Sequence, residues 1–307
     1  MEFDKIIIVR DKTRLEQLIE RFNSKSQAKF YLERSGGDIG FYELEHETFY
    51  KSLRKVEMDI SGFIKYKTIH RSFLPSYIFT QGDLILVIGQ DGLVANTAKY
   101  VKGQPIIAIN PDQYRYDGIL LLHTPNTFLD IVKSYCKGKN TTKKVTMAKV
   151  KLNDGQELLA FNDFYIGAAT HISSRYSIEY NGIKENQSSS GVLVSTGAGS
   201  TGWLSSIFNM NNNINTYTGQ LSKKHEVSLN WEDDKLLFVV REPFLSKMSE
   251  INLGFGIIKK EDTLLIESSM PTNGVIFSDG IESDFLNFNS GSICQISIAH
   301  EKANLVV

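Results

Sequence analysis

The stretch of this sequence best suited to chemistry is Gly89-Gln90-Asp91-Gly92, which follows an apolar run over 84–88 and precedes a helix-like segment over 93–101. In a strand–loop–helix arrangement, backbone N–H groups at the helix start can bind a phosphate. An Asp in such a loop repels phosphate, but it can take a proton from a hydroxyl group or hold a metal ion on a phosphate. The alternative is an ordinary turn in which Asp91 caps the helix, and these four residues alone leave it open.

Two stretches of the second half also contain polar groups suited to a nucleotide. The run 195–203 combines three glycines with two threonines and two serines, so it permits close backbone approach and offers hydroxyl groups to a phosphate or ribose. It lacks the Lys of a P-loop, which excludes that motif and leaves a plain flexible loop as the alternative. Asn162-Asp163 could bind a vicinal diol, although this pair is also common in turns.

The elements of the first half must position the Asp91 loop. Apolar, β-branched runs predict buried strands over 5–9, 84–88, 104–109 and 117–122. Thr13 and Glu16 form a capping-box pattern ahead of a helix, and Thr127 precedes another helix. Strands that alternate with helices indicate a parallel sheet, whose ligands bind at the carboxyl ends of the strands. Residues 89–92 and 110–112 both fall there.

The second half has a different pattern of apolar and turn residues. A polar linker over 138–144 is followed by short β-rich runs separated by turn residues, which predicts mostly antiparallel β structure. The Asn-rich stretch 209–224 is expected to be a loop. We therefore predict an α/β plus all-β fold. A Rossmann-like parallel-sheet domain over 1–140 carries the Asp91 loop, and a mostly antiparallel β-rich domain over 141–307 binds the ligand.

The composition indicates which partners and sites are not expected. Among 307 residues, 41% are apolar and 22% charged, and the net charge is −1, so no attraction to nucleic acid or an acidic membrane is expected. Cys136 and Cys294 form neither a disulfide framework nor a metal spacing, and the six histidines are scattered, so we assign no metal ligands in the protein. These features, with no membrane-length apolar run and no signal peptide, predict a cytoplasmic protein.

Taken in order, the motifs resemble those of the NAD kinase family, part of a superfamily with the diacylglycerol and sphingosine kinases. That family has a Gly-Gly-Asp-Gly loop, an Asn-Glu pair, a Thr-Gly-Ser-Thr loop and a late Asp-Gly. The corresponding residues here are Gly89-Gln90-Asp91-Gly92, Asn162-Asp163, Ala198-Gly199-Ser200-Thr201 and Asp279-Gly280. The mitochondrial-type branch is also similar at Lys12-Thr13-Arg14, Asn110-Pro111-Asp112, Ser189-Ser190-Gly191 and Arg241-Glu242-Pro243.

This resemblance implies ATP-dependent phosphorylation of the adenosine 2′-hydroxyl of NAD to NADP, with Mg²⁺ on the ATP phosphates and a homodimer or homotetramer as the assembly. Asp91 would be the catalytic residue, acting on the ribose hydroxyl as a base or an orienting group. The dinucleotide would be bound by residues of the three loops, namely Gly89, Gly92, Asn162, Asp163, Gly199, Ser200, Thr201, Gly202 and Ser206. One ligand that touches all of them would bridge the linker near residue 140.

The chain departs from the family pattern at three positions: Gln90 replaces a glycine, Asp163 a glutamate, and Ser190 an aspartate found in many members. If position 90 requires a positive φ, a side chain there costs about 1–2 kcal/mol. Two alternatives therefore stay open. One is a related kinase of a sugar, nucleoside or lipid hydroxyl, and the other is a nucleotide-binding module with reduced catalysis because of Gln90.

Overall fold

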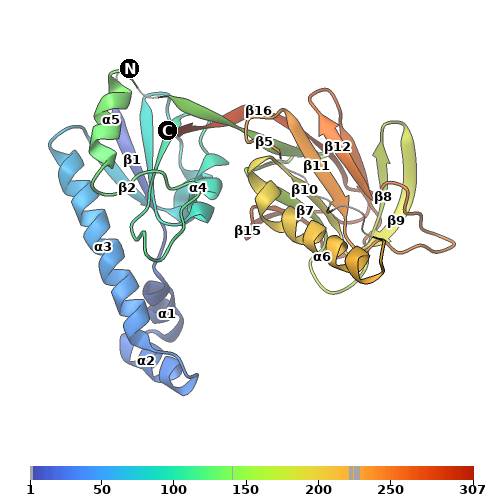
Figure 1. The fold of residues 1–307 in the computed structure, drawn as a ribbon, viewed down its shortest axis with the longest axis horizontal. Coiled ribbons are helices and arrows are strands. Elements are labelled where there is room, and N and C mark those ends of the chain that lie inside the picture. Colours follow the sequence, from blue (N-terminus) through green and yellow to red (C-terminus); the bar gives the residue numbers. More distant parts are fainter. Residues whose placement is uncertain (1–2, 140, 221–223, 225–228) are drawn as a thin grey trace. The chain divides into compact units, whose positions relative to one another are not determined.

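The computed structural model describes residues 3–139, 141–220, 224 and 229–307, and the chain forms two compact units (Figure 1). Unit 1 comprises Met1–Lys143 with Asn304–Val307, and unit 2 comprises Lys144–Ala303. The sequence predicts a boundary between residues 140 and 141, whereas residues 141–143 and 304–307 belong to unit 1. The predicted fold class is confirmed, because a parallel α/β unit is followed by an antiparallel β-rich unit.

Unit 1 is built on a parallel sheet with strand order β2-β1-β3-β4, and the end of β16 lies beside β4. Every residue of β3 is buried, as expected for a strand covered on both faces. The register pairs Ile6 with Leu84 and Ile85 with Ile106. The strands are β1 (Lys5–Arg10), β2 (Tyr66–His70), β3 (Asp83–Ile88) and β4 (Pro105–Ile109).

Helices cover both faces of this sheet (Figure 1), with α3 and α5 on one face and α4 on the other. Apolar residues of α3 and α5, such as Leu53 and Val132, pack against alternate strand residues. The predicted capping box of Thr13 and Glu16 begins α1. The helices are α1 (Arg14–Phe22), α2 (Lys25–Arg34), α3 (Ile39–Ser61), the 3₁₀ helix η1 (Arg71–Ser76), α4 (Asp91–Ala98) and α5 (Phe128–Cys136).

The expected strand over 117–122 is wrong. That segment belongs to an irregular loop, and only an isolated bridge between Ile109 and His123 extends the sheet there. Gly118 has a φ of +70°, and the Leu121 N–H donates to the Gly118 carbonyl, so the backbone turns instead of pairing with a neighbour. An apolar run of this length therefore does not by itself establish a strand.

Unit 2 contains an antiparallel sheet of order β12-β11-β10-β7-β14-β15 and a second group of antiparallel strands, β16-β13-β8-β9, with β5 and β6. Alternate residues of both sheets, such as Phe164, Phe238, Ile178 and Ile266, form one core. The strands are β5 (Thr142–Leu152), β6 (Glu157–Ala160), β7 (Asp163–Ala168), β8 (Ser174–Tyr180), β9 (Ile183–Ser189), β10 (Val192–Ser195), β11 (Lys235–Val240), β12 (Phe255–Lys259), β13 (Leu264–Ser268), β14 (Gly274–Ser278), β15 (Ile281–Asn287) and β16 (Ile293–Val306).

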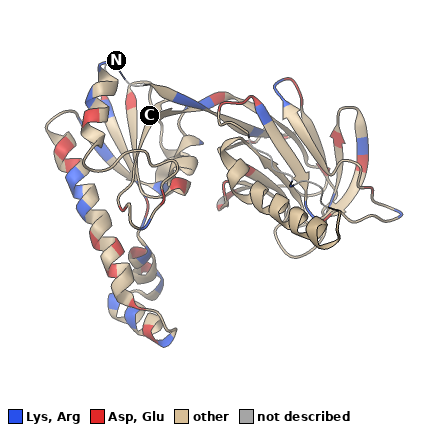
Figure 2. Cartoon of the chain, viewed as in Figure 1, with Lys and Arg blue, Asp and Glu red and all other residues tan. Residues whose placement is uncertain are grey.

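The Asn-rich stretch is helical up to Tyr217, so the expected loop is wrong for that part. It forms α6 (Trp203–Tyr217), after the 3₁₀ helix η2 (Ala198–Thr201). Packing explains this result, because Leu204 and neighbouring apolar residues of α6 contact Leu193 and Leu237 on the outer face of the sheet. No charged residue occurs in α6, unlike α1, α2 and α3 (Figure 2). Residues 221–223 lie outside the described residues.

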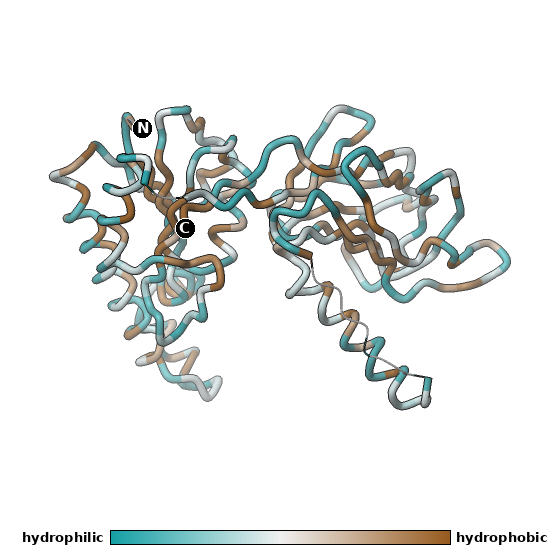
Figure 3. The backbone as a smooth tube through the Cα atoms, turned by 45° about the horizontal axis from the view of Figure 1, so that its top comes forward, coloured by the Kyte–Doolittle hydropathy of each residue, from teal (hydrophilic) through white to brown (hydrophobic). Residues whose placement is uncertain are grey.

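Hydropathy follows this architecture, since the apolar segments run through the strands inside each unit and the polar segments form the connections (Figure 3). Among the described residues, no helix has both the length and the apolar character needed to cross a membrane.

Candidate functional site

Asp91 is the first residue of α4, directly after the carboxyl end of β3. Its Oδ1 accepts a hydrogen bond of 2.8 Å from the backbone N–H of Leu120, in the loop that follows β4. The helix start has no side-chain cap, so Asp91 is not the simple cap of its own helix. Gly92 is exposed and has open space where a Cβ would be, which leaves the backbone of this turn accessible.

Gln90 adopts a φ of −105° and a ψ of 163°, an extended conformation that any residue accepts. Position 90 therefore does not require a positive φ, and the cost considered for a side chain there does not arise. The side chain is exposed, and its Nε2 donates to the Tyr116 hydroxyl at 3.3 Å. Gln90 thus imposes no backbone strain on the Asp91 loop, and the argument for reduced catalysis from strain does not hold.

The two loops expected at the carboxyl edge of the parallel sheet do meet there. Besides the Asp91–Leu120 and Gln90–Tyr116 contacts, the Gly89 N–H donates to the carbonyl of Ile109, the last residue of β4. The structure thus brings the Asp91 loop and the loop after β4 together within unit 1.

In unit 2, Asn162 and Asp163 form the turn between β6 and β7, and Asp279 determines its shape. The Asp279 carboxylate accepts hydrogen bonds from the backbone N–H groups of Phe161 at 3.0 Å, Asn162 at 2.6 Å and Asp163 at 3.2 Å. Asp279 itself has a φ of +55°, and Gly280 follows at +68°. The late Asp-Gly pair is therefore a scaffold for the Asn162-Asp163 turn.

The glycine-rich loop packs directly on this turn. The Thr196 N–H donates to the Asn162 carbonyl at 2.9 Å, and a Cβ at Gly199 would lie 2.2 Å from that same carbonyl oxygen. Only glycine fits at position 199, because the clash would be with backbone. The structure thus brings the predicted residues Asn162, Asp163 and Gly199 together.

The remaining predicted residues of this loop divide into two groups. Ser200 is buried and its hydroxyl donates to the Gly197 carbonyl at 2.8 Å, so Ser200 orders the loop. Thr201, Gly202 and Ser206 are exposed around the first turn of α6, which has no side-chain cap. The N–H groups of an uncapped helix start carry partial positive charge, which favours an anion.

Asp163 is 9% exposed, and burial, followed by repulsion from the Asp279 carboxylate, raises the pKa of Asp163 to about 7. Its side chain lies on the same face of β7 as that of Tyr165, because residues alternate along a strand. A carboxyl group with such a pKa can donate or accept a proton near neutral pH, which is a common property of ligand-binding and catalytic acids.

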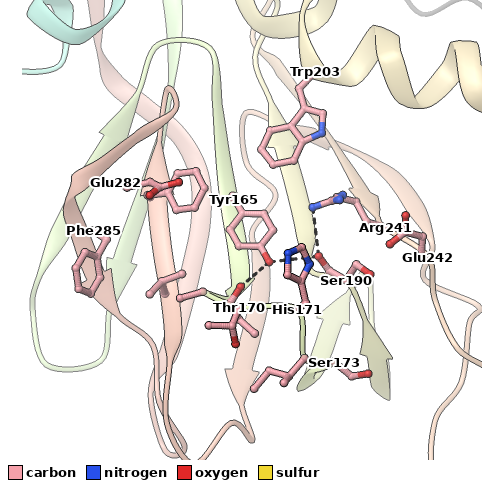
Figure 4. Close-up of a pocket in the computed structure, with 15 residues that line it drawn as sticks. Tyr165, Thr170, His171, Ser173, Ser190, Trp203, Arg241, Glu242, Glu282 and Phe285 are labelled. Carbon is pink, nitrogen blue, oxygen red and sulfur yellow. Dashed lines mark hydrogen bonds between the residues drawn. The ribbon is translucent and has the colours of Figure 1, made fainter. Parts of the chain in front are cut away.

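A pocket of about 850 Å³ lies on this outer face of the β7 sheet (Figure 4). The Tyr165 ring stacks with Trp203 at 5.9 Å and with Phe277 at 5.0 Å between ring centroids. The Arg241 guanidinium lies 5.0 Å from the Trp203 ring centroid, and burial raises the pKa of Tyr165. The lining residues are Tyr165, Ala168, Ala169, Thr170, His171, Ile172, Ser173, Ser190, Trp203, Arg241, Glu242, Val275, Phe277, Glu282 and Phe285.

Sequence reasoning missed Tyr165, Trp203 and Phe277 as pocket residues. Two sequence motifs could have pointed to this pocket, because Ser189-Ser190-Gly191 and Arg241-Glu242-Pro243 carry part of the family resemblance. The structure shows where these motifs lie. A Cβ at Gly191 would be 2.7 Å from the Tyr165 ring, and the Arg241 Nη1 donates to the Ser190 carbonyl at 3.4 Å. Both motifs therefore lie beside the aromatic residues of the pocket.

The arrangement of a parallel α/β unit and an antiparallel β-rich unit is shared with kinases of known structure. The structure is similar to that of yeast NADH kinase complexed with NADH, with a TM-score of 0.65 and 10% identity, covering 100% of this chain and 84% of that one. It is also similar to an NAD kinase from Archaeoglobus fulgidus in complex with ATP, with a TM-score of 0.58 and 13% identity, covering 99% of this chain and 93% of that one. No protein-family model and no curated protein matches the sequence.

The pKa of Asp163 predicts a pH dependence of stability. Because the pKa is about 7 in the folded chain against 3.8 ordinarily, the folded state binds more protons between these values. The free energy of unfolding should therefore fall as the pH rises from about 4 to 7, by up to about 1.4 kcal/mol per pH unit from this group. Asp163→Asn should flatten that dependence.

Urea unfolding at several pH values between 4 and 8 checks this prediction. Both tryptophans, Trp203 and Trp231, belong to unit 2, so tryptophan fluorescence reports the unit that contains Asp163. Identical slopes of unfolding free energy against pH in the wild type and Asp163→Asn would contradict the assigned pKa.

Proposed function

We propose that this chain is an ATP-dependent NAD or NADH kinase of the NAD kinase family, which phosphorylates the adenosine ribose 2′-hydroxyl to give NADP or NADPH. The observation that carries the proposal is a fold shared with NAD kinases over the whole chain, in which Asp91 begins the helix after a central parallel strand. The ordered motifs of the sequence support the same function independently of the fold.

Asp91 has the chemistry that the transfer needs. Among the contacts of the described residues, its Oδ1 is held by the Leu120 N–H at 2.8 Å, which fixes the carboxylate while Oδ2 can accept the proton of a ribose hydroxyl. Loss of that proton to Asp91 would let the hydroxyl oxygen bond to the terminal phosphorus of ATP, while the bond from that phosphorus to ADP breaks and ADP leaves. Phosphoryl transfer otherwise depends mainly on positioning and charge stabilisation, so one well-placed carboxylate suffices as a base.

Backbone groups and hydroxyls would bind the dinucleotide. We assign Gly89 and Gly92 to phosphate approach in unit 1, and Asn162 and Asp163 to the hydroxyl or amino groups of a nucleoside in unit 2. The exposed start of α6, with Thr201, Gly202 and Ser206, adds uncapped N–H groups and hydroxyls suited to an anionic ligand. In this assignment Gly199 and Ser200 act by shaping the loop.

The pocket lined by Tyr165, Trp203 and Phe277 has the flat apolar walls that stack on an aromatic heterocycle. That feature favours a nucleotide acceptor over a simple sugar. Magnesium would enter as the ATP complex, because Mg²⁺ is commonly bound by phosphates and one or two carboxylates. The described residues contain no group of three or more His, Cys, Asp or Glu side chains that could bind a metal ion on its own.

The test is an assay of the purified protein with ATP and Mg²⁺ and with NAD⁺, NADH, nucleosides and sugars as acceptors, with the phosphorylated product identified by mass spectrometry. We expect a 2′-phosphorylated dinucleotide. A phosphorylated sugar or nucleoside, with no dinucleotide product, would establish the related small-molecule kinase instead.

Binding can be tested separately from turnover by thermal shift. A dinucleotide at a hundredfold excess over its Kd should stabilise the protein by about 2.7 kcal/mol, a rise of several degrees in Tm. Thr201→Ala should reduce this rise, whereas Thr218→Ala, at the opposite end of α6, should not. No shift with any dinucleotide at millimolar concentration, alongside a clear shift with a sugar phosphate, would contradict the proposal.

A further inference from the structure

The loop between β4 and α5 contacts the proposed catalytic carboxylate, yet its backbone has little regular pairing. The Leu120 N–H that donates to Asp91 Oδ1 at 2.8 Å belongs to this loop, and no strand spans residues 110–122. Because a hydrogen bond is only as well placed as its donor, some other group must fix the position of Leu120.

Asn110 is the residue that closes this loop. It is 4% exposed, and its backbone N–H donates to the His123 carbonyl at 2.8 Å, joining the two ends of the loop. Its side chain accepts from the Asp112 N–H at 3.0 Å through Oδ1 and donates to the Tyr116 carbonyl at 3.0 Å through Nδ2. One amide group thus satisfies two backbone groups in the middle of the loop.

The turn that presents Leu120 also packs on this amide. Gly118 has a φ of +70°, and a Cβ there would lie only 2.7 Å from Asn110 Nδ2. The backbone two residues before Leu120 is therefore shaped around the Asn110 side chain. Helix α3 anchors the outer side of the loop, through the Ser52 hydroxyl to the Pro111 carbonyl at 2.9 Å and Glu45 to Arg115 at 3.8 Å.

We propose that Asn110 is a positioning residue, which fixes the loop so that the Leu120 N–H orients the Asp91 carboxylate. Its importance for turnover rests on the proposed function, in which Asp91 acts on the ribose hydroxyl. Asn110→Ala removes both side-chain hydrogen bonds, while the anchors on α3 remain and preserve the fold. The Leu120 N–H then loses its fixed place, and Asp91 samples unproductive orientations.

Asn304 supplies a matched control. Its Nδ2 donates to the Gly103 carbonyl at 2.6 Å, in the loop that precedes β4, whereas Asn110 follows the end of β4. Asn304→Ala therefore removes an amide-to-carbonyl hydrogen bond from the same unit and from the other end of the same strand. It should lower stability without affecting Asp91.

The first measurement is amide hydrogen exchange at Leu120, followed by NMR, which needs no enzymatic activity. We expect Asn110→Ala to accelerate exchange of this amide about tenfold or more, as Asp91→Ala should, while Asn304→Ala leaves it unchanged. Unchanged protection of Leu120 in Asn110→Ala would overturn the proposal, whether or not the protein proves to be a kinase.

The second measurement is kinetic. Asn110→Ala should lower kcat about 10–100-fold with KM for the dinucleotide changed less than about threefold, because misplacement of a reacting group affects the transition state. In an Asp91→Asn background, the same change should lower the remaining kcat less than about twofold. An equal fold-loss in both backgrounds would overturn the proposal. A wild type without any dinucleotide kinase activity would refute the proposed function alone, and the exchange measurement would still decide the role of Asn110.

Discussion

Replacement of Asp91 by Asn is expected to lower kcat by about 10²–10⁴-fold, the usual contribution of a general base. Asn is nearly isosteric with Asp, and its Oδ1 can still accept the Leu120 N–H that Asp91 accepts at 2.8 Å. The fold and the loop contact should therefore persist, so the loss of rate isolates the negative charge and the basic oxygen.

Steady-state kinetics and a thermal melt of the same samples check this result. Asp130→Asn is the matched control, because Asp130 is also an acid in the first turn of a helix in unit 1 but is exposed on α5. Its kcat should stay within about twofold of the wild type. Near wild-type kcat in folded Asp91→Asn protein would show that Asp91 is not the base.

Replacement of Asp279 by Ala is expected to lower the free energy of unfolding of unit 2 by at least about 3 kcal/mol and to abolish dinucleotide binding. The Asp279 carboxylate accepts from three consecutive backbone N–H groups, those of residues 161–163. Each donor left unpaired costs about 1–3 kcal/mol. The turn that presents Asn162 and Asp163 would then lose its shape.

Urea unfolding followed by tryptophan fluorescence, and a dinucleotide titration, test this variant. Asp154→Ala serves as the control, since Asp154 accepts the Gln156 N–H in an exposed turn of the same unit, and its loss should change Tm by no more than a degree or two. The pKa of Asp163 should also fall in Asp279→Ala, because a neighbouring negative charge is removed. Wild-type stability together with wild-type binding would contradict the scaffold role.

The fold class and the site loops could be predicted because their signals are local. Continuous apolar runs marked β1, β3 and β4, and a capping box marked α1. The Asp91 loop could be placed at the carboxyl end of a parallel strand from the order of its elements alone. The conformation of Gln90 could not be predicted, because a glycine in a family pattern does not reveal which φ that position adopts.

The pocket could not be predicted, because its walls come from separate strands. Tyr165 meets Phe277 through the pairing of β7 with β14, and it meets Trp203 through the packing of α6 on the sheet. These pairings depend on a strand order that no local pattern contains. The Asn-rich helix could not be predicted either, because it depends on tertiary packing. Contacts with Leu193 and Leu237 outweigh the weak helix propensity of Asn. The role of Asp279 was likewise hidden, because its three partners lie more than a hundred residues earlier.

The return of β16 to the first sheet has a consequence for biosynthesis. Asn304 and Leu305 pair with Pro105 and Ile106 of β4, and the Val306 carbonyl is 3.1 Å from His123 Nε2. A ribosome makes these residues only after all of unit 2, Lys144–Ala303, has been synthesised. Domains usually fold from the N-terminus during translation, but here β4 lacks its partner at Pro105 and Ile106 until the C-terminal residues emerge. We therefore expect unit 2, which is continuous in the chain, to complete its fold on the nascent polypeptide before unit 1 does.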